Sequence, residues 1–112
     1  MLTVDGITVY HTGDTGLTPD GILPTLDRPV DVMIAPINGA FGNLDARQAC
    51  ELAALVRPRM LIGCHVGMFV EQGGDPALFL TLAARELPEI QSLVMAPGDC
   101  LRYAAATREV AP

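Results

Sequence analysis

Two short apolar runs limit what this chain can fold into. One spans residues 30–35 and the other spans residues 60–64. Each run is followed by a glycine-containing loop and then by a segment whose apolar residues recur at helical spacing. Nearly continuous apolar runs of this length are typical of strands covered on both faces, and strands that alternate with helices form mostly parallel sheets. The sequence therefore predicts an α/β fold in the order ββ, connection, β, α, β, α, β, β.

The start of the chain predicts a β-hairpin. An Asp-Gly pair at positions 5–6 separates two runs of β-forming residues, 2–4 and 7–11. Both turn residues tolerate a positive φ, which a tight hairpin turn requires. Two further short strands are expected at 92–95 and 101–103, and the tail from Ala104 is expected to be frayed.

Cap residues and apolar spacing predict two helices. Asp45 is expected to cap a helix that runs to about Val56, and Asp75-Pro76 is expected to open a second helix that ends before Pro88. A shorter helix is expected to begin at Thr18-Pro19. The apolar faces of the two longer helices comprise Ala46, Ala49, Cys50, Leu52, Ala53 and Val56 in one, and Leu78, Phe79, Leu82, Ala83 and Leu87 in the other.

The bulk composition narrows the class of protein and its partners. A chain of 112 residues has the length of one domain. Its net charge of −6 and the lack of a basic cluster exclude nucleic acid and anionic membrane surfaces as partners. No apolar run reaches membrane-spanning length, and three cysteines without paired spacing suit a reducing compartment. We therefore expect a cytoplasmic protein with no membrane or nucleic-acid partner.

Two predicted strands end in residues that could bind a metal. Asp14 follows the second hairpin strand, and His65 follows the run at 60–64. Because parallel strands present their carboxyl ends at one edge of a sheet, Asp14 and His65 are hypothesised to meet and to serve one metal site. A capping aspartate and a hydrogen-bonded core histidine are the alternative, since two residues do not complete a site. His11 could complete a minimal set or be structural, and Cys64 is expected to face away from His65.

The loop at 36–43 is a candidate substrate contact. Its sequence, Pro-Ile-Asn-Gly-Ala-Phe-Gly-Asn, can turn sharply and can offer backbone N–H groups and side-chain amides to a ligand. The candidate contacts are Asn38, Gly39 and Asn43. An ordinary connection with turn-forming asparagines is the alternative.

These motifs in this order resemble the second half of the metallo-β-lactamase fold. The set comprises Thr-Gly-Asp-Thr around Asp14, the Ile-Asn-Gly loop, and Cys-His-Val-Gly-Met-Phe around His65. It is most similar to the L-ascorbate-6-phosphate lactonase-like group of metal-dependent hydrolases. The resemblance implies that residues 1–112 form one domain, the C-terminal half of an αββα sandwich. It also implies that Asp14 and His65 are ligands of a divalent metal, zinc or manganese, in lactone or ester hydrolysis by metal-bound hydroxide, with the 36–43 loop beside the active site.

One part of that family's pattern is missing from this sequence. The principal ligand motif, His-x-His-x-Asp-His, belongs to the first half of the fold, and this chain has only His11 and His65. We therefore expect a fragment or truncated member that is inactive as this chain alone, with metal absent or weakly bound. A small-molecule substrate would bind only if the fold is completed. The alternative function is a stand-alone α/β module that binds a partner without catalysis.

The uncovered sheet predicts association. In the αββα sandwich that the resemblance implies, this half would pack its sheet against the sheet of the other half. A bare face of that kind would expose apolar side chains on strands such as the one at 30–35. A homo-oligomer that buries this sheet face is therefore expected.

Overall fold

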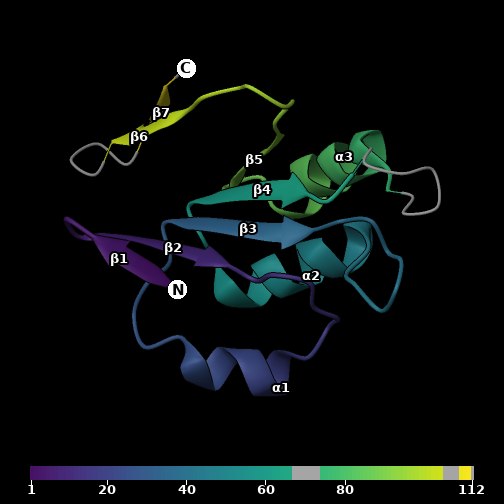
Figure 1. Ribbon diagram of the computed structural model, residues 1–112, viewed down its shortest axis with the longest axis horizontal. Coiled ribbons are helices and arrows are strands. Elements are labelled where there is room, and N and C mark those ends of the chain that lie inside the picture. Colours follow the sequence, from purple (N-terminus) through teal and green to yellow (C-terminus); the bar gives the residue numbers. More distant parts are fainter. Residues whose placement is uncertain (67–73, 105–108, 112) are drawn as a thin grey trace.

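The computed structural model describes residues 1–66, 74–104 and 109–111, and its centre is a five-stranded sheet in the order β1-β2-β3-β4-β5 (Figure 1). β1 is antiparallel to β2, and β2 to β5 are parallel neighbours. This arrangement confirms the predicted α/β class. None of the helices in the described ranges is long and apolar enough to cross a membrane. The elements are β1 (Leu2–Val4), β2 (Ile7–His11), α1 (Pro19–Ile22), a 3₁₀ turn (Leu23–Thr25), β3 (Val32–Pro36), α2 (Ala46–Val56), β4 (Met60–Cys64), α3 (Pro76–Glu86), β5 (Gln91–Val94), β6 (Arg102–Ala104) and β7 (Glu109–Ala111).

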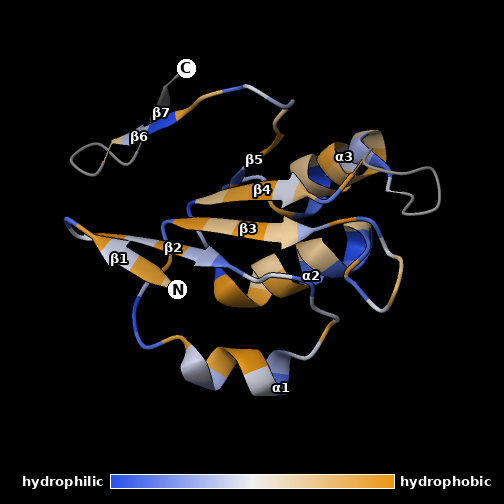
Figure 2. Ribbon diagram, in the orientation of Figure 1, coloured by the Kyte–Doolittle hydropathy of each residue, from blue (hydrophilic) through white to orange (hydrophobic). Residues whose placement is uncertain are grey.

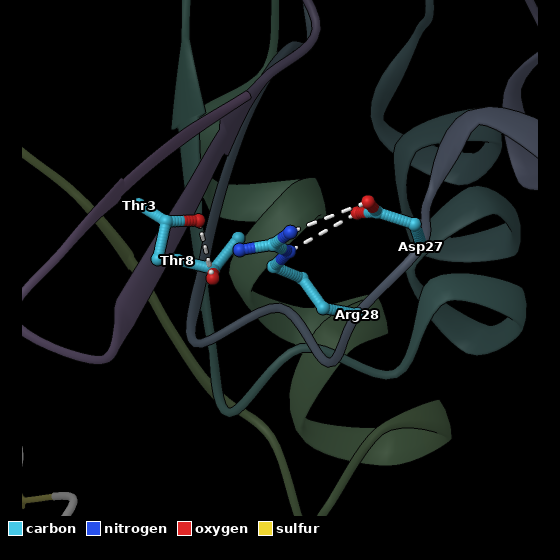
Figure 3. A network of polar contacts seen from close by, with 4 residues as sticks. All are labelled: Thr3, Thr8, Asp27 and Arg28. Carbon is cyan, nitrogen blue, oxygen red and sulfur yellow. Dashed lines mark hydrogen bonds and ion pairs between the residues drawn. The ribbon is translucent and has the colours of Figure 1, made fainter.

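The predicted hairpin is confirmed. Asp5 and Gly6 have φ values of 51° and 80°, as a type I′ turn requires. Across the two strands, the hydroxyl oxygens of Thr3 and Thr8 lie 2.9 Å apart in a hydrogen bond (Figure 3). Nearby, Arg28 donates to the adjacent carboxylate of Asp27, but both side chains are exposed, so this ion pair contributes little to stability.

The caps of both longer helices are as predicted. Asp45 and Gln48 form a reciprocal capping box at the start of α2, in which the Gln48 N–H donates to Asp45 Oδ1 at 2.8 Å. Arg57 ends α2 in the left-handed conformation, with φ 56°. At the start of α3, the Leu78 N–H donates to Asp75 Oδ1 at 2.9 Å.

The core lies between one face of the sheet and the helices α2 and α3. Figure 2 shows β3 and β4 apolar along most of their length. Leu78 was expected on the buried face of α3 but is 44% exposed. The sheet-facing positions are Phe79, Leu82 and Ala83, and Leu78 lies at the margin of this face, about 100° around the helix from Phe79. The buried core cluster comprises Val30, Met33, Ala35, Ile37, Leu44, Ala46, Ala49, Cys50, Leu52, Ala53, Leu61, Phe79, Leu82, Ala83, Leu87 and Ile90.

The C-terminal part departs from the prediction. β6 does not extend the five-stranded sheet but pairs antiparallel with β7, and the two strands form a separate sheet. The expectation of a frayed tail from Ala104 was therefore wrong for residues 109–111. A contact far away in sequence fixes β6, because the Tyr103 hydroxyl donates to Asp31 Oδ1 at 3.0 Å.

The buried thiol of Cys50 provides a test of this packing. Cys50 is 1% exposed, and burial, followed by the negative charge of Glu86, raises its pKa from 9.0 to about 11. At pH 8, a pKa of about 11 in place of 9.0 lowers the thiolate fraction of Cys50 about a hundredfold. The thiolate is the reactive form of the side chain. We expect an alkylating reagent at pH 8 to modify exposed Cys100 at least a hundredfold faster than Cys50, as followed by mass spectrometry of tryptic peptides.

The same pKa shift predicts how stability depends on pH. The folded state favours the protonated thiol, so its contribution is complete below pH 9.0 and is lost as the pH rises towards about 11. Urea unfolding at several alkaline pH values checks this dependence.

For the alkylation experiment, equal labelling rates of Cys50 and Cys100 would contradict the burial of Cys50.

Candidate metal site

The parallel strands bring Asp14 to the carboxyl-terminal edge of the sheet. The arrows of β2, β3 and β4 point the same way in Figure 1, so all three strands end at this edge. Beyond β2, the Thr12 N–H still donates to the Ile34 carbonyl at 2.9 Å. Gly13 then turns the chain with φ 67°. This turn leaves Asp14 on the surface, with its side chain 74% exposed.

His65 lies directly after β4 in an unusual backbone conformation. Its φ of 65° is in the left-handed region, which residues other than glycine rarely adopt and which concentrates at functional sites. Its side chain is only 18% exposed, and Nδ1 lies 3.2 Å from Asp14 Oδ1. The two side chains therefore meet at one edge of the sheet, as the hypothesis required.

The contact between these two groups is close but is not a hydrogen bond. The distance of 3.2 Å between Nδ1 of His65 and Oδ1 of Asp14 is within hydrogen-bonding range, but the buried Nδ1 has no hydrogen-bond partner in the described part of the chain. Two ligands roughly 2.0–2.2 Å from a tetrahedral zinc stand about 3.3–3.6 Å apart, close to the observed separation. An unpaired nitrogen beside a carboxylate thus fits two ligands of one cation.

His11 does not join this pair. Its Nδ1 accepts a hydrogen bond from the Gly13 N–H at 2.9 Å. In a neutral imidazole whose Nδ1 accepts, Nε2 bears the proton and has no lone pair for a metal. His11 therefore has a structural role in the turn before Asp14. Among the residues that the structure describes, no group of three or more His, Cys, Asp or Glu side chains could hold a metal ion.

Cys64 was expected to face away from His65 if both lay on the strand, but β4 ends at Cys64, so His65 is not on the strand. Both residues line one pocket of about 350 Å³, together with Ile34, Ile62, Gly63, Val66, Met95, Ala96 and Pro97. The prediction assumed strand alternation, which the left-handed backbone of His65 breaks. Burial, and then the negative charge of Asp14, raise the pKa of the Cys64 thiol. Cys64 therefore lines the pocket, and its surroundings favour the neutral thiol.

The second half of the 36–43 loop packs against the turn that contains Asp14. The Leu44 N–H donates to the Thr15 carbonyl at 2.7 Å. A Cβ at Gly16 would lie 2.8 Å from the Gly42 carbonyl oxygen, so the two backbones approach closely. Asn43, 9% exposed, is next in the chain to both Gly42 and Leu44. The Asn43 end of the loop thus lies beside the sheet edge that contains Asp14 and His65.

The first half of the loop lies by a different pocket. Asn38 is 6% exposed and lines a space of about 320 Å³ between the starts of α2 and α3, where His65 is not a lining residue. Neither Oδ1 nor Nδ2 of Asn38 has a hydrogen-bond partner within the described ranges. Gly39 has φ 65°, and a Cβ there would lie 2.9 Å from the Cβ of Asp45. The turn itself therefore requires glycine at position 39, independently of any contact that Gly39 makes with a ligand.

One residue near the site was missed by sequence reasoning. Phe41 lies in the same loop, is 79% exposed and has φ 55°. The sequence did contain a sign of this exposure: Phe41 stands between two glycines of a loop, and core residues are rarely found in such a position. Met68 and Phe69 of the Cys-His-Val-Gly-Met-Phe motif, for which packing is the expected role, lie outside the described residues.

Three comparisons give this geometry a context. The model of the beta-lactamase superfamily domain matches residues 1–65, which include both Asp14 and His65. A solved structure, Igni18, described as a novel metallo hydrolase from the archaeon Ignicoccus hospitalis, superposes with a TM-score of 0.72 at 30% identity. The match covers 87% of this chain and 41% of that one.

Curated relatives agree with that structural match. A UPF0173 metal-dependent hydrolase of Caldivirga maquilingensis is 36% identical over 94 residues, which are 83% of this chain and 40% of the relative. One from Pyrococcus furiosus is 30% identical over 102 residues, 90% of this chain and 44% of the relative. This chain therefore spans less than half the length of the relatives that it matches.

Proposed function

Because this chain belongs to the beta-lactamase superfamily, we propose that Asp14 and His65 are two ligands of a divalent metal in a hydrolase of lactones or related esters. The observation that supports this most is the unpaired, buried Nδ1 of His65 beside the Asp14 carboxylate. The homologues are metal-dependent hydrolases, so a divalent metal is expected in the family. Zinc and manganese are the proposed ions.

The two residues would have different roles. A bound divalent metal supplies an acidified water and polarises a carbonyl. Asp14 would contribute an exposed carboxylate oxygen, whereas His65 would contribute a buried imidazole nitrogen that its left-handed backbone holds in place. Orientation of both ligands comes from the sheet, since the strands before them are neighbours of β3.

The loop at residues 36–43 would provide the substrate contacts. We assign this role to Asn38, Gly39 and Asn43. Asn43 directly precedes Leu44, whose N–H donates to the Thr15 carbonyl in the turn of Asp14. Gly39 would act through its backbone, and Asn38 through an amide that has no other partner in the described residues. A substrate that reached both pockets would have to extend across the end of β3.

The chain alone is proposed to be inactive. A catalytic zinc usually has three protein ligands and a water, and this edge provides two. The proposal is that the remaining ligands come from the other half of an αββα sandwich, which the relatives are long enough to contain. Lactone hydrolysis by this chain is accordingly expected not to exceed that of an Asp14→Asn variant.

Paramagnetic broadening tests the metal ligands even if binding is weak. We expect Mn²⁺ added to the ¹⁵N-labelled chain to broaden the His65 imidazole and the amide signals of Gly13 and Thr15 first. Asp14→Asn keeps the shape of the side chain but removes its charge, and is expected to weaken this effect at least tenfold.

Asp20→Asn is the matched control, because it removes the same charge from an exposed carboxylate six residues further along the chain. This variant is expected to broaden like the wild type. Broadening that survives Asp14→Asn, or that Asp20→Asn removes equally, would refute the assigned pair.

A further inference from the structure

Phe41 has a backbone conformation that is unfavourable for an aromatic residue. The Asn43 N–H donates to the Ala40 carbonyl at 3.0 Å, and φ is 55° at Phe41 and 81° at Gly42, as in a type I′ turn. The central positions of this turn favour Gly, Asn or Asp, and a bulky residue is strained there. Strained residues of this kind concentrate at active sites and at places that hold a ligand.

The chain on both sides of this turn is firmly anchored. Asn38 and Asp45 form an antiparallel bridge at its base, and the Gly39 N–H donates to the Leu44 carbonyl at 3.0 Å. Leu44 is completely buried. The 79% exposure of Phe41 is therefore not the result of a loosely held loop, because ordered neighbours hold this residue in contact with water.

The turn at Phe41 lies beside the turn that contains Asp14. The carbonyl oxygen of Gly42, the residue after Phe41, would lie 2.8 Å from a Cβ at Gly16. Gly16 is only two residues after Asp14. The backbone contact that joins the loop to the proposed metal ligand thus also sets the position of Phe41.

We propose that Phe41 contacts the substrate and selects an ester or lactone with an apolar substituent. This inference rests on the proposed function, in which the ester carbonyl lies beside Asp14 and His65. An exposed phenyl ring offers an apolar surface to a ring or chain attached to that ester, and contact would remove both surfaces from water. The strained turn then has a use, because it holds an aromatic residue next to the metal ligands.

Ligand-observed NMR with two lactones tests this contact. γ-Phenyl-γ-butyrolactone differs from γ-butyrolactone by one apolar ring, and neither has to be hydrolysed for its binding to be measured. The wild-type chain is expected to bind the phenyl lactone about tenfold more tightly, which is roughly the contribution of an aromatic pair and its buried area. Phe41→Asn is expected to remove this preference and to leave the binding of γ-butyrolactone unchanged.

Urea unfolding separates a binding role of Phe41 from a packing role. Asn adopts the left-handed conformation more readily than Phe, so Phe41→Asn is expected not to lower the midpoint of unfolding. A lower midpoint would show that the ring packs within the fold, and would overturn the proposal.

Leu55→Asn is the matched control for the lactone experiment. Leu55 is also an exposed apolar residue, at 52%, but it lies on α2. This variant is expected to keep the full preference for the phenyl lactone. A wild type without the preference, a preference that survives Phe41→Asn, or equal losses in the two variants would overturn the proposal.

The Mn²⁺ experiment keeps this contact distinct from the proposed metal site. Broadening of the His65 signals by Mn²⁺ is expected to be the same in Phe41→Asn as in the wild type. Loss of the phenyl preference with normal broadening would support both assignments. Absence of broadening in the wild type would refute the metal ligands, whereas normal broadening without a phenyl preference would refute only the role of Phe41.

Discussion

Replacing Phe79 with alanine is expected to lower the free energy of unfolding by about 3–5 kcal/mol. Phe79 is completely buried and is the largest of the fully buried side chains. Removing a buried ring costs its transfer free energy and leaves a cavity that the surroundings fill only in part. Since a small domain is stable by roughly 5–15 kcal/mol, this loss is a large share of the total.

The ring also supports the candidate site. A Cβ at Gly63 would lie 3.0 Å from Cε2 of Phe79 and 3.1 Å from Cδ1 of Ile37, so the ring packs directly under β4. Gly63 is two residues before His65, and Ile37 is next to Asn38. Phe79→Ala is therefore expected to loosen the end of β4 as well as the core, and so to weaken the Mn²⁺ effect at His65.

Urea unfolding followed by circular dichroism measures the loss. Leu80→Ala is the control, because Leu80 is the next residue in α3 but is 39% exposed. Its expected cost is about 1–2 kcal/mol, since only part of its apolar surface is removed from water on folding. Similar losses in the two variants would contradict the placement of Phe79 in the core.

Replacing Asp31 with alanine is expected to cost about 2–5 kcal/mol. Asp31 is 5% exposed and joins three segments of the chain. Its Oδ2 accepts from the Thr8 N–H at 2.9 Å, its Oδ1 accepts from the Tyr103 hydroxyl at 3.0 Å, and Arg59 Nε lies 3.8 Å from Oδ1. Alanine would remove the acceptor of a buried backbone N–H, which costs more than the net contribution of a hydrogen bond.

Tyr103→Phe separates the contributions in this network. It removes one donor and retains the carboxylate with Thr8, so the expected cost is about 0.5–1.5 kcal/mol. Thermal unfolding of both variants provides the comparison. If Tyr103→Phe cost as much as Asp31→Ala, the link to β6 would be the main contribution, and the bond to Thr8 would be minor.

The candidate site was only partly predictable. The sequence identified Asp14 and His65 as residues at strand ends, because an apolar run followed by glycine is a local pattern. It did not predict that Cys64 and His65 line one pocket, because alternation along a strand does not extend to His65, which lies beyond β4 with φ 65°. It missed Phe41, and it did not separate the pocket of Asn38 from that of His65, since pockets form between elements distant in the sequence.

By itself, the sequence determined the features that depend on a few neighbouring residues. The Asp5-Gly6 turn, the caps Asp45 and Asp75, and the bounds of β4 follow from backbone preferences and from hydrogen bonds within four residues. The tertiary structure alone decided the distance of 3.2 Å between Asp14 and His65 and the pairing of β6 with β7. It also decided which face of the sheet remains open. The site distance and the open face depend on contacts between segments far apart in the sequence, and the position of β6 depends on the bond from Tyr103 to Asp31, 72 residues away, which no local pattern encodes.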